Sequence, residues 1–347
     1  MLRALVRYEM DDRDHALRLL RTLPREHTGA AAVRVLVSFG TGRYPDVVAE
    51  YDTRVRPHFR ALVSAQPHGA AVASLATAAA CTALVESGAA PEALALTREA
   101  LDLLPDALPE RLPPLIVEVD CLTSEGRLVE AHHAAEALRD WGLATHGPQA
   151  TGAGLAYLGV ICAAHGSHHR AAAHMREATG LAYERNFLHV RRRRLALLAG
   201  YEAVCGNFDA ARAAIREATR EGRSGEEFAA MLLRNAQALL LACGGALRDA
   251  ADHLRRSADH AAARGAPGRT ITALHLLARL GHARDAARRL ADADVDRSPV
   301  SHAQVGHIRA LVDRDPAALL DVAAEWERMR MWHLAAEAND VAAAALS

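Results

Sequence analysis

The densest cluster of charge in the sequence is a run of four arginines at 191–194, within the segment HVRRRRLALLAGYEAV. On a helix, four consecutive residues point in nearly all directions, so at least one of these arginines must face inward if the helix is packed. A planar guanidinium can hold a carboxylate or a phosphate through two hydrogen bonds. We therefore expect Arg193 to face inward and to hold an anionic group. The alternative is a solvated outer face whose methylene stems cover apolar surface.

Histidine and cysteine, the side chains that bind zinc, gather in the segment CAAHGSHHRAAAH at 162–174. Cys162 and His165 are one helical turn apart, but the other histidines lie beyond a glycine. A zinc site also needs convergent ligands that further hydrogen bonds hold in place. We predict no metal site, and we interpret His132 and His133, one unit earlier, as part of a polar surface stripe.

Motifs for catalysis are missing from the sequence. It contains no GxSxG and no HExxH, and all 41 of its lysine-plus-arginine residues are arginine. Without lysine, neither Schiff-base chemistry nor a lysine-containing phosphate loop is possible. Acidic pairs such as Glu226 and Glu227 are typical of exposed helix starts. We expect a protein that is not an enzyme and that uses no cofactor.

Charge and composition exclude further classes of partner. The formal net charge is −1, so the chain lacks the basic field that drives binding to nucleic acids or anionic membranes. The beginning of the chain lacks the apolar segment of a signal peptide, and prolines, histidines and glycines interrupt the uncharged stretches at 61–85 and 141–169. Five cysteines without a CxxC indicate reduced core thiols. We expect a cytoplasmic protein that binds neither nucleic acid nor a membrane.

The elements that would position these side chains follow from a repeated phrase. A glycine recurs at intervals of roughly 40 residues, and alanine stands five residues after six of the seven glycines. The glycines are Gly42, Gly88, Gly126, Gly166, Gly206, Gly245 and Gly281. Such a period with two helices per unit indicates an α-solenoid, in which small side chains let helices cross closely. The glycine ends the first helix of each pair in a backbone conformation that other residues adopt at a cost.

This phrase resembles the tetratricopeptide repeat (TPR), with an aromatic or aliphatic residue two positions after the glycine at Tyr44, Leu128, Phe208 and Leu247. The resemblance implies an all-α fold, a right-handed superhelix of about eight to nine hairpins. It implies a capping hairpin at 1–27, seven units at 28–295 and closing hairpins at 296–347. The chain departs from the family in lacking its early tryptophan and in having longer, variable periods.

The closing stretch, RDPAALLDVAAEWERMRMWHLAAEANDVAAAAL at 314–346, carries a second resemblance. It is similar to the end of the repeat region in large ATP-binding LuxR-type transcriptional regulators of actinobacteria, the maltose-activator-like group. In that family a nucleotide-binding module comes first, the superhelix senses an inducer or partner, and a helix-turn-helix domain binds DNA. This chain contains neither flanking module, so the resemblance implies the sensor region of a longer regulator. The alternative is a stand-alone scaffold that binds a peptide segment of a partner protein.

In the TPR family the first helix of each hairpin lines a concave groove, and the family's register predicts which residues face it here. The predicted ligand-binding residues are Asp120, Thr123, Val160, Arg193, Leu232, Asn235, Leu239 and His275. A mostly apolar surface with sparse polar groups suits a small-molecule inducer or an amphipathic peptide. Two alternatives stay open: that neighbouring helices fill the groove themselves, and that solenoid ends pair into a homodimer.

The repeat predicts that its alanines sit at tight helix crossings. Replacing Ala171 or Ala211 by leucine should overpack such a crossing and lower the free energy of unfolding by about 1–3 kcal/mol. Thermal unfolding of the two variants measures this cost. An unchanged midpoint in both would show that the repeat register is wrong.

Overall fold

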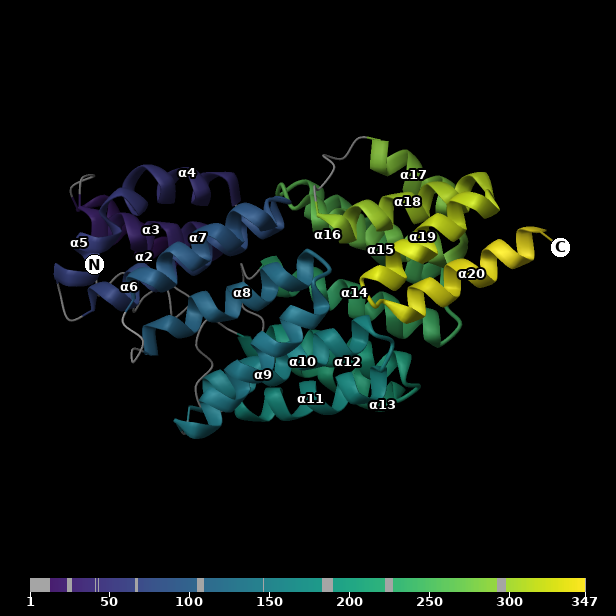
Figure 1. The fold of residues 1–347 in the computed structure, drawn as a ribbon, viewed down its shortest axis with the longest axis horizontal. Coiled ribbons are helices and arrows are strands. Elements are labelled where there is room, and N and C mark those ends of the chain that lie inside the picture. The colour runs from purple at the N-terminus through teal and green to yellow at the C-terminus, as the bar shows by residue number, and fades with distance from the viewer. Residues whose placement is uncertain are drawn as a thin grey trace.

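The computed structural model describes residues 13–23, 27–40, 42, 44–65, 68–104, 109–145, 147–182, 190–221, 227–291 and 298–346. In these ranges every regular element is a helix, and most helices form antiparallel pairs stacked side by side (Figure 1). The fold is therefore an all-α, TPR-like solenoid, as the sequence predicts.

The helices follow one another in pairs. The first helices are α3 (Thr28–Gly40), α6 (Gly69–Glu86), α8 (Leu112–Ser124), α10 (Pro148–Ala164), α12 (Val190–Val204), α14 (Glu227–Cys243) and α16 (Pro267–Leu277). Their partners are α4 (Tyr44–Arg54), α7 (Ala90–Leu103), α9 (Leu128–Ala144), α11 (His168–Leu181), α13 (Phe208–Glu221), α15 (Leu247–Ala262) and α17 (Ala283–Ala291). Helix α2 (Arg13–Arg21) precedes them, and α5 (Phe59–Ala65) lies between α4 and α6. The chain closes with α18 (Pro299–Asp313), α19 (Pro316–Arg328) and α20 (Trp332–Leu346).

The turn between the helices of a pair requires a left-handed backbone. All seven predicted turn glycines have φ between 71° and 90°, which confirms their role. Arg314 after α18 and Arg330 after α19 adopt the same conformation, with φ of 52° and 60°. The closing helices thus use the same kind of turn without glycine, and the glycine pattern could not reveal them.

The small residues of the repeat lie where helices cross. The residue five positions after each turn glycine is 0% exposed in all seven pairs, at Val47, Ala93, Ala131, Ala171, Ala211, Ala250 and Ala286. The residue two positions after the glycine is less uniform, because Tyr44 and Leu128 are buried whereas Leu247 is 49% exposed. The prediction of five core thiols is right for Cys81 and Cys121 and wrong for the exposed Cys243, although all five cysteines are free.

The solenoid closes on itself, so that helices from its two halves touch. Arg269 on α16 donates three hydrogen bonds of 2.9–3.1 Å to the carboxylate of Glu86 on α6, whose side chain is 1% exposed. One apolar cluster includes Val35 on α3, Leu128 on α9 and Trp326 on α19. The α16 helix lies between the N-terminal helices and the C-terminal ones in Figure 1.

The last two helices pack against turns in the middle of the chain. A Cβ atom placed on Gly126 would lie 2.5 Å from the Met329 sulfur, and one on Gly166 would lie 2.9 Å from Cβ of His333. The rings of His333 and His168 are 5.6 Å apart in an edge-on contact. These two glycines therefore serve closure of the solenoid as well as the turn.

Of the helices in the described part of the chain, α6 alone is long and apolar enough to span a bilayer. Its 18-residue window is 78% buried against other helices, as expected for the core helix of a folded domain.

The two roles of glycine can be separated by a matched pair of variants. Gly166 and Gly206 have similar φ values, 87° and 80°, but nothing lies within 4 Å of a Cβ on Gly206. Gly206→Ala should lower the free energy of unfolding by about 1–2 kcal/mol, because alanine is strained in this backbone conformation. Gly166→Ala should lower the free energy of unfolding by about 1–3 kcal/mol more than that, because α20 must also move. Urea unfolding measures both, and equal costs would contradict the packing of α20 on this turn.

Candidate functional site

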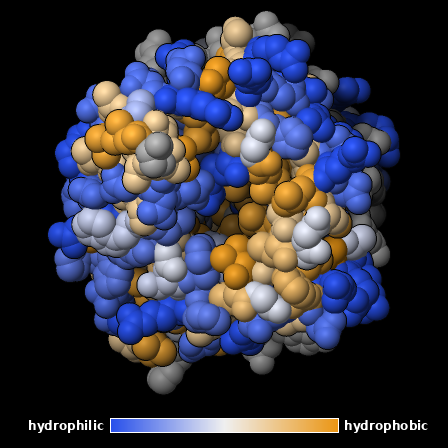
Figure 2. Space-filling model, turned by 90° about the vertical axis from the view of Figure 1, so that its right-hand side faces the viewer, coloured by the Kyte–Doolittle hydropathy of each residue, from blue (hydrophilic) through white to orange (hydrophobic). Residues whose placement is uncertain are grey.

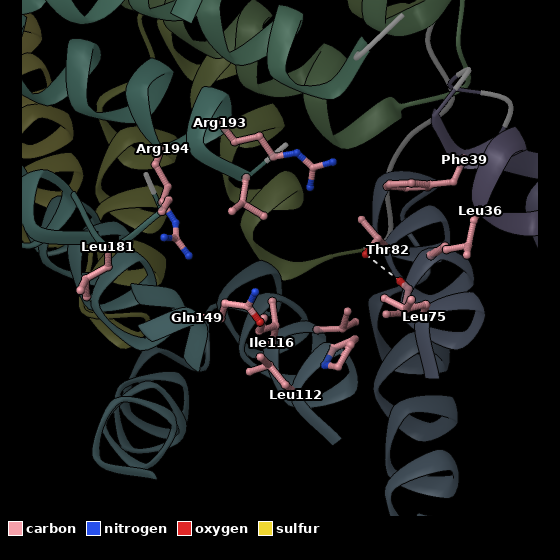
Figure 3. A pocket seen from close by; sticks show the side chains of 16 residues that line it. Leu36, Phe39, Leu75, Thr82, Leu112, Ile116, Gln149, Leu181, Arg193 and Arg194 are labelled. Atoms are coloured by element: carbon pink, nitrogen blue, oxygen red, sulfur yellow. Dashed lines mark hydrogen bonds between the residues drawn. The ribbon is translucent and has the colours of Figure 1, made fainter. Parts of the chain in front are cut away.

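A cavity whose volume, counted together with its opening to solvent, is about 1000 Å³ lies between the first helices of successive pairs. Its walls are mostly apolar and come from α3, α6, α8, α10 and α12, with Leu181 and Ala182 at the end of α11. In Figure 3, Arg193 and Arg194 of α12 extend into this space opposite Leu36 and Phe39 of α3. Thr82 of α6 also lines it, and its hydroxyl donates to the carbonyl of Ala78 at 2.8 Å.

A second cavity of about 950 Å³ adjoins the first and shares part of its wall. The shared residues are Thr82, Ile116, Val117, Val190, Arg193 and Arg194. We call the two together the inner cavity, with an apolar arm at α3 and α6 and a polar end where α8, α10, α14 and α16 meet. Viewed from the C-terminal helices, the molecule is also hollowed at its centre, with hydrophobic side chains along one side of the hollow (Figure 2).

The polar end holds charges of both signs. Asp120 of α8, Tyr157 of α10, Arg193 and Arg269 line it, and Arg269 is held there by Glu86. Burial raises the pKa of Asp120 to about 6, while Arg269 and Arg193 oppose this rise. Burial next to Asp120 also raises the pKa of the Tyr157 phenol. Asp120 thus changes its charge within the physiological pH range.

The four consecutive arginines of α12 point in different directions, as the sequence predicts. Arg191 pairs with Glu217 on α13, and Arg192 donates to the carbonyl of Ala218 on the same helix at 3.2 Å. Arg193 faces inward and lines both cavities. The sequence did not single out Arg194, which also lines both.

Arg194 is a buried cation in the wall of the inner cavity. Its side chain is 7% exposed, and its Nη1 donates to the carbonyl of Ala178 on α11 at 2.7 Å. A Cβ on Gly152 would lie 2.8 Å from that nitrogen, so the glycine provides the room that the guanidinium occupies. Burial lowers the pKa of Arg194 to about 10, which shows how poorly its charge is solvated.

Four of the eight predicted site residues lie together in the lining of the inner cavity: Asp120, Val160, Arg193 and Leu232. The other four are outside it. The hydroxyl of Thr123 donates to the carbonyl of Val119 at 2.8 Å, one turn back on its own helix. The amide oxygen of Asn235 accepts from Ser257 on α15 at 2.7 Å.

Leu239 and His275 are the other two residues outside the inner cavity. A methyl carbon of Leu239 lies 3.4 Å from where a Cβ of Gly200 would stand, so this side chain packs on α12. His275 is 2% exposed, and its Nε2 lies 3.0 Å from Nδ1 of His307 on α18. The closing helices α18 and α19 therefore cover α16 at His275, whose ring also lies 6.0 Å from that of Trp326.

The predicted polar stripe of histidines lies on α9. Nδ1 of His132 is 3.2 Å from a Glu136 oxygen, an ordinary pairing one helical turn apart. Within the described residues, His132, His133 and Glu136 bring three potential metal ligands within 4.8 Å of one another. His133 is 75% exposed, and the group lies outside the inner cavity.

Closure by the Glu86–Arg269 pair can be tested against an exposed pair of the same kind. Glu86→Gln should lower the free energy of unfolding by about 2–3 kcal/mol, because it removes the carboxylate that pairs with the partly buried Arg269. Glu99→Gln removes one of the two carboxylate partners that Arg56 has in the described part of the chain, the other being Asp52, from a pair that is about half exposed, and should lower the free energy of unfolding by about 0–1 kcal/mol. Urea unfolding of both variants measures the difference. Equal costs would show that the buried pair does not hold the solenoid closed.

Comparisons with known proteins agree on the fold. No protein-family model and no curated protein matches the sequence. The structure is similar to a Rap protein solved in complex with the competence and sporulation factor, with a TM-score of 0.54 and 13% identity over 83% of this chain and 85% of that one.

Two further structures are similar. Aspartyl phosphate phosphatase F from Bacillus subtilis matches with a TM-score of 0.51 and 12% identity over 85% of this chain and 74% of that one. The Cut9–Hcn1 structure of the APC/C matches with a TM-score of 0.52 and 13% identity. The match covers 95% of this chain but 60% of that one. At such low identity, these likenesses establish the TPR-like fold alone.

Proposed function

We propose that this chain is a non-catalytic sensor and interaction domain that binds an inducer or a partner in its inner cavity. The observation that carries this proposal is the cavity itself. It is mostly apolar and is supplied with a few charged groups at one end. Closure through Glu86 and Arg269 ties α16, which lines the polar end, to α6, which lines both cavities.

The lining residues support binding rather than catalysis. Among the described residues that line the inner cavity there is no cysteine, serine or histidine to serve as a nucleophile with a neighbouring base. Among the described lining residues, α6 contributes the hydroxyl of Thr82, which donates to its own helix. Asp120 and Tyr157, whose side chains hydrogen-bond to each other, instead form a polar pair that a bound molecule would meet at this end.

The context we propose is a cytoplasmic LuxR-type transcriptional regulator of the maltose-activator-like group. The resemblance of 314–346 to the end of that family's repeat region supports it. That same segment forms α19 and α20, which pack on the turns at Gly126 and Gly166. A ligand that changed the closure of the solenoid would therefore move the end of the chain to which a DNA-binding domain is attached in that family.

A stand-alone scaffold that binds a peptide segment is the second candidate. It is supported by the similar Rap structure, which contains the competence and sporulation factor, and by Cut9, which is assembled with Hcn1. The natural reading frame separates the two contexts. A nucleotide-binding module before this region and a helix-turn-helix domain after it would support the regulator, and the lack of both would refute it.

Native mass spectrometry of the purified chain tests the binding function. Ile116→Trp places a large ring in the wall that both cavities share, whereas Val129→Trp changes a 41% exposed position on α9. We expect wild type and Val129→Trp to carry a bound mass, after purification or after incubation with a cell extract, and Ile116→Trp to lose it. The same spectra count subunits and so reveal a homodimer.

A bound mass that persists in Ile116→Trp would place the ligand outside the inner cavity and refute the proposal. Circular dichroism of both tryptophan variants should match wild type, which excludes unfolding as the cause of a loss.

A further inference from the structure

We propose that the ligand of the inner cavity is a small apolar molecule with one anionic group, and that Arg194 together with Arg193 holds this group. The inference rests on the proposed function and names the chemical class of its ligand. It follows from the burial of Arg194, the charges around the apolar arm and the scarcity of neutral polar groups there.

Arg194 is a cation that its surroundings leave uncompensated. More than nine-tenths of it is buried, and no carboxylate in the described part of the chain forms an ion pair with it. A buried charge without a counter-charge is costly, and proteins normally pair it. Its bond to Ala178 satisfies a carbonyl in the last turn of α11 and occupies only one of its five donors. Arg194 lines both cavities, where an anion would complete the pair.

The charged side chains in the described lining of the apolar arm are all of one sign. Its described lining contains two cations, Arg193 and Arg194, and no carboxylate. Both belong to the first two turns of α12, and the positive end of the helix dipole also favours an anion there. The opposite wall, with Leu36, Phe39 and Leu75, is apolar. The cavity is thus complementary to a molecule with a hydrophobic body and a negative end.

The scarcity of neutral polar groups favours a small molecule over a peptide. Apart from the two arginines, the side chains with hydrogen-bonding groups in the lining of the apolar arm are Thr82 and Gln149. The Thr82 hydroxyl already donates to Ala78. A peptide would bring several backbone N–H and C=O groups that each need a partner when buried. A single carboxylate or sulfonate on an apolar body needs only the arginines.

Protonation of Asp120 predicts that the binding of an anionic ligand depends on pH. The charged or titratable groups that face Asp120 are Glu86 on α6, Tyr157 on α10, Arg193 on α12 and Arg269 on α16. Glu86 and Arg269 neutralise each other, so Asp120 competes with a bound anion for Arg193. Its protonation near pH 6 removes this competition. An anionic ligand should therefore bind more tightly as the pH falls from about 7.5, where Asp120 is mostly charged, to about 5.5, where it is mostly neutral.

The test uses two probes of the same shape and different charge, naphthoate and its neutral amide, naphthamide. Isothermal titration calorimetry of wild type should show one naphthoate site per chain, at least about tenfold tighter than naphthamide, because charge-assisted hydrogen bonds contribute more than neutral ones. Arg194→Gln keeps a donor for Ala178 but removes the charge, and should abolish the preference. Arg194→Lys keeps the charge and should retain most of it.

Arg192→Gln is the matched control. Arg192 also donates to a carbonyl in the last turn of the neighbouring helix, that of Ala218, but it does not line the inner cavity. It should leave the preference for naphthoate unchanged. Asp120→Asn should bind naphthoate at pH 7.5 as wild type does near pH 5.5, with little further change on acidification.

Three outcomes would overturn the inference: naphthoate no tighter than naphthamide, a preference that survives Arg194→Gln, or no binding of either probe. If native mass spectrometry still shows a bound mass that Ile116→Trp removes, the ligand-binding function stands and only the anionic class of ligand falls. If both probes bind Ile116→Trp as well as wild type, the inner cavity is not their site, and both proposals lose their support.

Discussion

The contact between Glu86 and Arg269 is the constraint on which the shape of the inner cavity depends. The two residues are 183 positions apart, and their three hydrogen bonds bring α16 against α6. A carboxylate that is 1% exposed has lost almost all its water, so it requires the guanidinium where it is. Because Arg269 also lines the polar end, closure of the solenoid and the electrostatics of the cavity share one side chain. A ligand that binds Arg269 would therefore also change the contact between Arg269 and Glu86 that closes the solenoid.

Small side chains determine both the packing and the empty space. At the crossings, the buried alanines let paired helices approach closely, and larger groups do not fit. On the inner side, Ala78 and Ala79 of α6 and Ala153 and Ala156 of α10 line the cavity, and their short side chains leave it open. The same residue type thus fills space on one side of the helix layer and leaves space on the other.

Helix α12 shows how one run of identical residues takes separate structural roles. Because successive residues turn by about 100°, Arg191 and Arg192 reach α13, Arg194 reaches α11, and Arg193 reaches into the cavity. The surroundings of each guanidinium differ in burial and in counter-charge. These surroundings, and not the residue type, decide which arginine bonds to a neighbouring helix and which lines the cavity.

The sequence by itself determined the repeat, because turn glycines and crossing alanines are local requirements of each helix pair, and all seven glycines have the expected backbone. It also identified Asp120, Val160, Arg193 and Leu232 as inward-facing, since a helical register carries that information. Only the tertiary structure decided that the solenoid closes and that Arg269 both closes it and lines the cavity. It also decided that His275 contacts His307 instead of facing the groove. These depend on which distant helices meet, and that is set by the summed curvature of many units, which no local spacing records.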